Sequence, residues 1–262
     1  MSAILATLVA GLVVLVGPAA AVQYGQPDRS GHPYVGLVVV YDAGDAPLWR
    51  CSGTLIAPTV LLTAGHCTFG TASARVWFDA EVTAATGYPF SGGVTGTPQS
   101  HPDFDDFASF PNTRDLGVVV LNSAVTGKGY GALPSGGYLD DLATRRGVQD
   151  RTFTVVGYGL QSVKPVLSQQ RTQMVGTVSL VNLRSALTDG FNVQTTDSPG
   201  QGHGSGGTCF GDSGGPLFAG ATSRVVAVAS FGLNTNCKGS SFFYRVDTEP
   251  ARSFLDDYVT LP

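Results

Sequence analysis

Gly211-Asp212-Ser213-Gly214-Gly215-Pro216 is the segment from which the rest of this sequence can be interpreted. Glycine has no Cβ and tolerates positive φ, so glycines around Ser213 permit a sharp turn and the close approach of another group. At such a turn a serine Oγ and neighbouring N–H groups can face the same space, which is the arrangement that acyl transfer needs. A surface turn with an incidental serine fits the segment equally well, so the interpretation depends on residues upstream.

A catalytic serine needs a general base, and the base needs a group that orients it. The chain has four histidines. One of them, His66, follows an apolar, strand-like run that ends in small residues. Asp115 opens the apolar run 116–121, where an unpartnered carboxylate would be costly to bury. A histidine N–H would offset that cost, so His66 and Asp115 are candidate partners.

Three segments together resemble the trypsin/chymotrypsin family of serine endopeptidases. They are Thr63 to Cys67, Asp115-Leu116 before an apolar strand, and Gly211 to Pro216, in that order. The resemblance implies that His66 is the general base, Asp115 its orienting acid and Ser213 the nucleophile. It also implies an oxyanion hole made by the backbone N–H groups of Gly211 and Ser213.

Other classes of hydrolase fit less well. The serine segment also matches the G-x-S-x-G turn of α/β-hydrolases, but those enzymes place the catalytic histidine after the serine, and no histidine follows Ser213. A subtilisin-like order needs an aspartate before the histidine, and Asp42 and Asp45 lie in a loop-like stretch with no helical pattern behind it. Two alternatives stay open, a non-catalytic binding module of the same fold and an esterase.

The composition indicates a turn-rich β protein. Glycine is abundant, with 35 residues, and Lys128, Lys164 and Lys238 are the only lysines. The balance of 15 basic and 19 acidic side chains gives no case for binding nucleic acid or an anionic membrane. The length suits one large all-β domain or two small ones.

Short apolar runs separated by Gly, Pro, Asp and Ser predict two sets of strands. The first set is Tyr34–Tyr41, Leu48–Ile56, Val60–Thr63, Ala74–Phe78 and Leu116–Leu121; the second is Phe153–Gly159, Met174–Leu183, Phe191–Thr195, Pro216–Phe218, Val225–Phe231 and Phe242–Val246. They fit the architecture that the resemblance implies, an all-β fold of two six-stranded antiparallel β-barrels with the site in the cleft between them.

The expected order is an N-terminal barrel at 22–125, a linker at 126–150, and a C-terminal barrel with a terminal helix at 151–262. The helix is expected over Thr248–Leu261. Thr248 is a candidate N-cap and Pro250 suits the first turn, while Phe254, Leu255 and Tyr258 form an apolar face.

Residues 1–21 are expected to be a signal peptide. The apolar run Ile4–Val16 is too short to span a bilayer, Gly17-Pro18 breaks it, and Ala19-Ala20-Ala21 offers a cleavage site. No Lys or Arg precedes the run, which departs from the usual pattern, so a buried N-terminal helix or a membrane anchor is the alternative. The expectation is a secreted protein without stable membrane insertion.

Cleavage after Ala21 would make Val22 the N-terminal residue. In the family that the sequence resembles, a freed Ile or Val α-amine pairs with the Asp before the nucleophile, here Asp212, and orders the site. Pro33-Tyr34 matches a Pro-aromatic pair of the family, although Gln23 and Tyr24 are not the usual residues. The hypothesis is that signal peptidase itself creates the active terminus. Activity should then fall at alkaline pH as the amine loses its proton.

Four cysteines in an exported chain predict two disulfides, for which three pairings exist. The resemblance favours Cys51–Cys67, beside His66, and Cys209–Cys237, beside Ser213. No C-x-x-C pair or other ligand cluster indicates a metal, and no cofactor is expected. Calcium binding by the acidic loop residues 103–106 matches no loop motif and stays open.

In the family, the side chain N-terminal to the cleaved bond enters a pocket whose base lies six residues before the serine. That position is Gly207 here, next to the neutral Thr208. The opposite wall matches Ser230-Phe231-Gly232, and Ser241 falls near the back, although the spacing from Gly232 to Cys237 looks one residue longer than usual.

A neutral pocket predicts cleavage after Phe, Tyr or Leu in preference to Arg or Lys, because burying an unpaired Arg is costly. Phe210 could instead narrow the pocket and favour smaller residues. The expected partners are polypeptide substrates and proteinaceous inhibitors, and the protein is expected to be a monomer.

Overall fold

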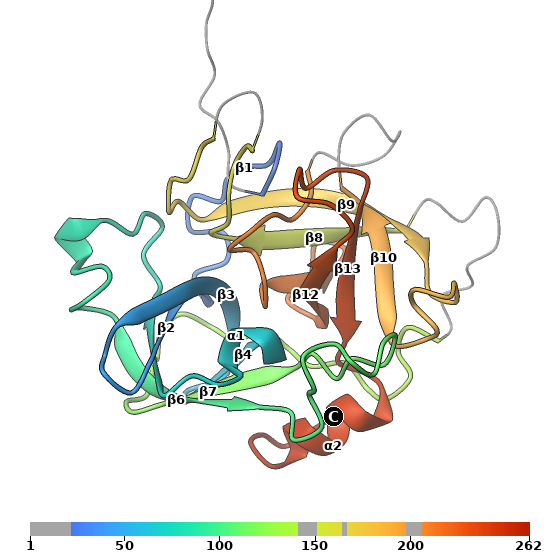
Figure 1. The fold of residues 1–262 in the computed structure, drawn as a ribbon, viewed down its shortest axis with the longest axis horizontal. Helices are drawn as coiled ribbons and strands as arrows, with labels where there is room; N and C mark the ends of the chain where they lie inside the picture. Colours follow the sequence, from blue (N-terminus) through green and yellow to red (C-terminus); the bar gives the residue numbers. More distant parts are fainter. Residues whose placement is uncertain (1–21, 141–150, 164–166, 198–205) are drawn as a thin grey trace, which may run out of the picture.

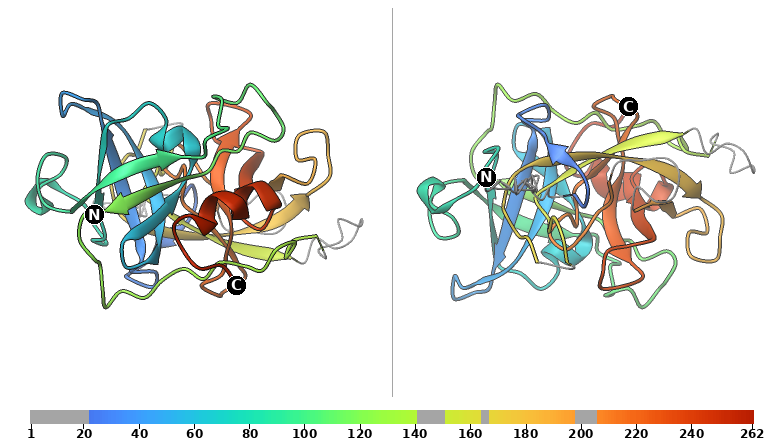
Figure 2. Two further views of the ribbon diagram at one scale, coloured as in Figure 1. Left: turned by 90° about the horizontal axis from the view of Figure 1, so that it is seen from below. Right: turned by 90° about the horizontal axis from the view of Figure 1, so that it is seen from above.

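The computed structural model describes residues 22–140, 151–163, 167–197 and 206–262. The expected signal peptide, the end of the expected linker and His203 lie outside these ranges. Two β-barrels lie side by side, the first drawn in blue to green and the second in yellow to red (Figure 1, Figure 2). The prediction of an all-β fold with two barrels and a short C-terminal helix is confirmed.

The first barrel closes in the order β2-β3-β4-β7-β6-β5, with every pair antiparallel. Its strands are β2 (Val35–Tyr41), β3 (Pro47–Ala57), β4 (Val60–Thr63), β5 (Ser73–Trp77), β6 (Val94–Ser100) and β7 (Gly117–Leu121). All seven residues of β2 are buried, as its unbroken apolar run predicts. β6 was not predicted, because its sequence VTGTPQS contains glycine, proline and polar residues and lacks an apolar pattern.

The second barrel has the strand order β9-β10-β13-β12-β11-β8 and closes through pairing of β8 with β9. Its strands are β8 (Thr152–Gly157), β9 (Met174–Asn182), β10 (Asn192–Thr196), β11 (Pro216–Ala219), β12 (Val225–Gly232) and β13 (Ser240–Arg245). The two-residue strand β1 (Gln26–Pro27) adds to the free edge of β9, so the sheet has one strand more than expected.

Short helical segments complete the fold. They are α1 (Gly65–Thr68), η1 (Ala84–Thr86) and α2 (Glu249–Asp256). α2 is shorter than expected: it ends at the acidic pair Asp256-Asp257, where negative charge opposes the helix dipole. Thr248 occupies the N-cap position, but its side chain makes no capping hydrogen bond, so that prediction is wrong. No helix among the described residues is both long and apolar enough to cross a membrane.

Ser52, on β3 of the first barrel, joins the two barrels at the serine segment. Its N–H donates to the carbonyl of Ser213 at 2.8 Å, and its Oγ donates to the carbonyl of Gly211 at 2.9 Å. The same Oγ accepts the N–H of Tyr158, just after β8, at 3.0 Å. The side chain is fully buried. These bonds fix the serine segment of the second barrel against a strand of the first.

Candidate active site

Pairing of β4 with β7 brings His66 and Asp115 together. Thr63, at the end of β4, lies opposite Gly117, at the start of β7. The residues that follow β4 and those that precede β7 therefore meet at one end of the first barrel. Asp115 Oδ1 accepts the backbone N–H of His66 at 2.7 Å, and Oδ2 lies 2.9 Å from His66 Nδ1. The aspartate is completely buried and orients the ring from behind.

The charges of this pair are coupled. Burial alone would raise the pKa of Asp115, but the positive charge of His66 and hydrogen bonds from His66 and Ser230 hold that pKa below its ordinary value. Burial acts to lower the pKa of His66, but the Asp115 charge and hydrogen bond, with a contribution from Asp106, raise it overall. Ionised Asp115 thus stabilises a protonated imidazole, which is what a general base becomes when it accepts a proton.

The serine segment turns as its glycines predict. Gly211 has φ +96° and Gly214 has φ +74°. Among the described residues, the N–H groups of Asp212 and Gly214 donate to carbonyl oxygens, whereas those of Gly211 and Ser213 donate to none. The two residues expected to form an oxyanion hole are therefore the ones that have free N–H donors in this turn.

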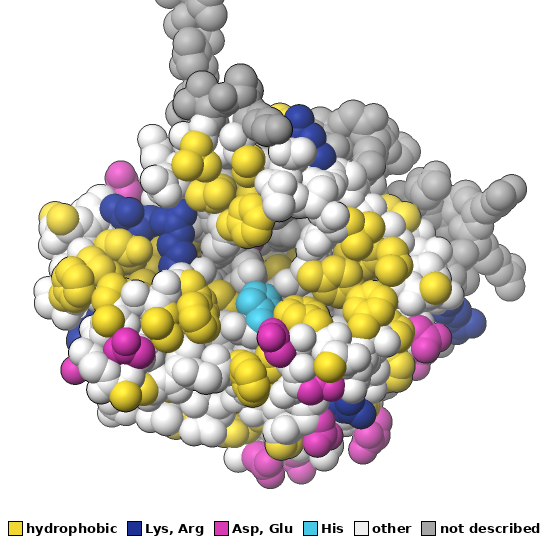
Figure 3. All heavy atoms as spheres, viewed as in Figure 1, with side chains coloured by type: hydrophobic (Ala, Val, Ile, Leu, Met, Phe, Trp, Pro, Cys, Tyr) yellow, Lys and Arg dark blue, Asp and Glu magenta, His cyan; other side chains and the backbone are white. Residues whose placement is uncertain are grey.

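Ser213 and His66 line one cavity of about 640 Å³ between the barrels. No hydrogen bond joins Ser213 Oγ to the ring in the part of the chain that the structure describes. The face drawn in Figure 3 is hollowed near its centre, where a histidine side chain lies between hydrophobic side chains.

Most of the expected pocket residues also line this cavity. They are Thr208, Phe210, Ser230, Phe231, Gly232 and Ser241. Gly207 does not, and this corrects the expectation that it forms the base of the pocket. It is buried beneath Asp197, whose carboxylate occupies the space that a Cβ at position 207 would enter. Asp197 lines the cavity in its place. The expectation of a neutral pocket did not take the carboxyl group of Asp197 into account.

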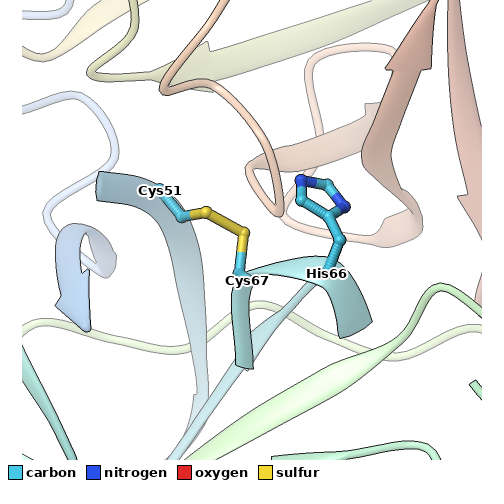
Figure 4. Close-up of side chains that lie close together, drawn as sticks. All are labelled: Cys51, His66 and Cys67. Carbon is cyan, nitrogen blue, oxygen red and sulfur yellow. A yellow bond between two sulfur atoms is a disulfide. The ribbon is translucent and has the colours of Figure 1, made fainter. Parts of the chain in front are cut away.

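Two disulfides frame the cavity, Cys51–Cys67 and Cys209–Cys237. Figure 4 shows the first one joining β3 to α1, with the His66 ring projecting from α1 beside it. Among the described residues, His66 and these two cysteines form the one cluster of three possible metal ligands. Metals bind cysteine as the thiolate, and both sulfurs are here bonded to each other. This cluster therefore offers a metal only the imidazole.

Among the described residues, no hydrogen bond or ion pair joins Val22 to Asp212, the pair that was expected to form on activation. Val22 is fully buried in the core of the second barrel, next to Gly176 and Gly206. The following residue, Gln23, accepts the N–H of Gly207 at 3.0 Å. The N-terminal segment is thus attached directly to the loop that leads to the serine.

Asp212 is a buried acid that backbone N–H groups hold in place. Its two carboxylate oxygens accept the N–H groups of Gly159 at 2.8 Å and Cys209 at 3.0 Å. Among the described residues, no Lys, Arg or His lies within ion-pair distance of it. Burial raises its pKa to about 7, although the two N–H groups and Arg50 act to lower it.

Sequence reasoning missed three contributions to the site. It did not find Ser52 as the link between the barrels, nor Asp197 above Gly207. Ser230 was expected only as a pocket wall, but its Oγ donates to Asp115 Oδ2 at 2.5 Å. Short polar residues within or just after apolar strands are the signal that could have directed attention to all three.

A buried acid, a histidine and a serine beside free N–H donors form the type of site found in serine hydrolases. The sequence model of the trypsin family matches residues 25–251. The chain therefore belongs to the trypsin family of serine endopeptidases. Membership of a protease family implies polypeptide substrates.

The chain is 29% identical over 185 residues to trypsin alpha of Drosophila melanogaster, which covers 70% of this chain and 67% of that protein. It is 29% identical over 216 residues to a chymotrypsin of Phaedon cochleariae, covering 81% and 73%. It is 26% identical over 212 residues to a trypsin of Saccharopolyspora erythraea, covering 77% and 82%. Because these relatives include both trypsins and a chymotrypsin, they do not determine which side chain this chain accepts before the cleaved bond.

Two solved structures share the fold. HL collagenase superposes with a TM-score of 0.67 at 20% identity, covering 89% of this chain and 95% of that one. HBP superposes with a TM-score of 0.62 at 23% identity, covering 90% and 95%. At these identities the likeness concerns the architecture alone.

Proposed function

We propose that this chain hydrolyses peptide bonds through an acyl-enzyme, with Ser213 as nucleophile, His66 as general base and Asp115 as the orienting acid. The proposal rests on one observation: buried Asp115 is hydrogen-bonded to His66, and His66 and Ser213 line the same cavity. The complete set of catalytic groups disfavours a non-catalytic binding module. An esterase would use the same groups, and membership of the trypsin family favours the peptidase over it.

The steps follow from the positions of these groups. His66 Nε2 takes the proton from Ser213 Oγ as Oγ attacks the carbonyl carbon of the substrate. The N–H groups of Gly211 and Ser213 donate to the resulting oxyanion. His66 then protonates the leaving amine, which departs and leaves an ester on Ser213. Water, activated by the same histidine, hydrolyses that ester and restores the serine.

The decisive experiment compares the secreted protein with a Ser213→Ala variant. The wild type should digest casein and be labelled on Ser213 by a serine-directed acylating reagent. The variant should lose roughly 10³-fold or more in turnover while remaining folded. A folded wild type that is neither labelled nor active would support the binding module. Hydrolysis of activated esters without any cleavage of peptides would support the esterase.

We also propose that the protein is secreted and begins at Val22 once residues 1–21 are removed. The buried, unpaired carboxylate of Asp212 supports this, because a freed α-amine at Val22 would supply the missing positive charge. The test uses recombinant protein with a removable tag joined directly before Val22. Removal of the tag, which exposes the Val22 α-amine, should raise activity in the wild type and leave an Asp212→Asn variant inactive. A secreted protein with another N-terminal residue, or full activity before tag removal, would contradict this part.

The proposed preference is for apolar or aromatic side chains before the cleaved bond. Phe231 lines the cavity and stacks on Phe242, with ring centroids 4.6 Å apart, so one wall is a flat apolar surface. Phe210 is exposed at the cavity and leaves the alternative of a narrower pocket. A panel of peptides that differ only at this position tests it. We further propose a monomer that proteinaceous inhibitors can block, which size-exclusion chromatography and inhibitor titration test.

A further inference from the structure

Asp197 contributes a carboxyl group to the pocket, although it lies outside the sequence motifs from which the pocket was predicted. The residue directly follows β10, whose pairing with β13 places Thr196 opposite Ser240 and Thr195 opposite Ser241. That register carries Asp197 to the lining of the cavity that Ser213 also lines. Only 2% of its surface is exposed.

The carboxylate stands where a side chain at position 207 would stand. A Cβ added to Gly207 would overlap both the side chain and the backbone of Asp197. Glycine at 207 is therefore the residue that leaves room for Asp197, and the two positions form one arrangement. The pocket therefore does contain an acid, which comes from the residue that directly follows β10.

Hydroxyl groups hold the Asp197 side chain in place. Ser241 Oγ donates to Asp197 Oδ1 at 2.8 Å, and Thr208 Oγ1 lies 2.7 Å from Ser241 Oγ. Both hydroxyls line the same cavity. The base of the pocket is thus a connected polar group, beneath walls that include Phe231.

No described cation neutralises this acid. Arg50, His66 and Lys238 also line the cavity, but none is within ion-pair distance of Asp197. The other titratable group that acts on it is the Asp212 carboxyl, which is also negative when ionised. The charge of the pocket base therefore depends on the protonation of Asp197.

We propose that Asp197 determines which side chain the pocket accepts: ionised Asp197 pairs with Arg or Lys, and protonated Asp197 admits apolar and aromatic side chains. This rests on the peptidase activity proposed above and deepens it. A buried guanidinium needs a carboxylate partner, whereas a buried carboxylate facing an aromatic ring has no partner and is disfavoured. The preference for Phe, Tyr and Leu would then describe the protonated pocket.

The change falls in an accessible pH range. Burial raises the pKa of Asp197 to about 7, with a further increase from Asp212; the hydrogen bonds from Ser241 and the Thr208 backbone act in the opposite direction. Asp197 is therefore mostly protonated below this pH and mostly ionised above it. A bound guanidinium favours the ionised form, so cleavage after Arg should gain relative to cleavage after Phe as the pH rises.

The test uses the mature enzyme and three peptides that differ only before the cleaved bond, with Phe, Arg or citrulline, the uncharged analogue of Arg. The measured quantity is the ratio of kcat/KM for Arg to that for Phe from pH 6 to pH 8. Titration of His66 affects both peptides and cancels in the ratio. The ratio should rise about tenfold or more, because one pKa unit on either side of the midpoint changes the ionised fraction by about that factor. The ratio of citrulline to Phe should not rise.

Two variants test the role of the carboxyl group. Asp197→Asn should abolish the rise, so that the ratio of kcat/KM for Arg to that for Phe stays constant between pH 6 and pH 8. Ser241→Ala removes a hydrogen bond that favours the ionised form, so the midpoint of the rise should move to higher pH. Asp257→Asn, an exposed acid at the end of α2, is the matched control and should behave as the wild type.

The outcomes separate this inference from the proposed function. Cleavage after Phe with a ratio that is independent of pH and unchanged in Asp197→Asn overturns the role of Asp197 and leaves the peptidase intact. Absence of all cleavage contradicts the peptidase. In that case, binding of benzamidine and of neutral benzamide still decides the role of Asp197. Benzamidine binding that strengthens with pH in the wild type but not in Asp197→Asn supports it, and equal behaviour of the two proteins refutes it.

Discussion

Ser230 Oγ, on β12 of the second barrel, donates a 2.5 Å hydrogen bond to Oδ2 of Asp115, which belongs to the first barrel. The acid that orients His66 is therefore held from both sides of the cleft. Its position depends on the docking of the two barrels, and so does the orientation of the imidazole.

Ser230→Ala should lower kcat/KM. A hydrogen bond to a charged group contributes about 1.5–3 kcal/mol, so a loss of roughly ten- to a hundredfold is expected if the bond supports the reacting geometry. Steady-state kinetics with a peptide substrate measures it. The exposed Ser223→Ala is the matched control and should have wild-type kinetics. Equal activity of both variants would show that Ser230 is only a wall of the pocket.

The pH profile should report the pairing of His66 with Asp115. His66 acts as a base only when neutral, and its pKa is raised, so kcat/KM should increase with pH through a midpoint above the ordinary value of 6.5. Asp115→Asn should move this midpoint to lower pH and reduce kcat by about 10⁴-fold.

Asp105→Asn changes a partly exposed acid in the loop before Asp115 and serves as the control for that profile. It should leave both the midpoint and the rate unchanged. A larger loss of kcat in Asp105→Asn than in Asp115→Asn would show that Asp115 is not the orienting acid.

Ser52→Ala should weaken both stability and catalysis. The substitution leaves the N–H of Tyr158 and the carbonyl of Gly211 without their buried partner. Such losses cost about 1–3 kcal/mol of unfolding free energy. Urea unfolding measures the stability, with the exposed Ser91→Ala as control. Because the bonds also position the serine segment, kcat should fall even at urea concentrations well below the unfolding midpoint, where the variant is folded. Wild-type kcat in a destabilised variant would limit Ser52 to a structural role.

Gly214→Ala and Gly220→Ala separate backbone strain from steric overlap. Both glycines have positive φ, at +74° and +56°. A Cβ at 214 would overlap Thr63 and lie 2.7 Å from the Ala64 nitrogen, whereas one at 220 would meet nothing within 4 Å. Gly220→Ala should therefore cost only the strain of about 1–2 kcal/mol, and Gly214→Ala should cost more and abolish activity. Thermal unfolding and peptide hydrolysis measure both. Similar losses would mean that strain alone requires glycine at 214.

Local sequence patterns were enough to predict most of the strands and the three catalytic motifs of this protein. Unbroken apolar runs such as Val35–Tyr41 predict buried strands, because a barrel strand must bury its side chains. The motifs at His66, Asp115 and Ser213 carried a family resemblance, and from it a fold, a set of roles and two disulfide pairings. The strand β6 escaped prediction because barrel closure, and not its own composition, keeps VTGTPQS extended.

The tertiary structure alone decided which groups from distant parts of the chain share a space. Nothing near Asp197 in sequence indicates that its carboxyl would lie over Gly207, and nothing near Ser230 indicates a bond to Asp115. Both contacts depend on register: β10 against β13 for the first, and the docking of one barrel on the other for the second. Local sequence encodes which segments become strands, but the charge of a pocket is the sum of side chains that only the packed strands bring together.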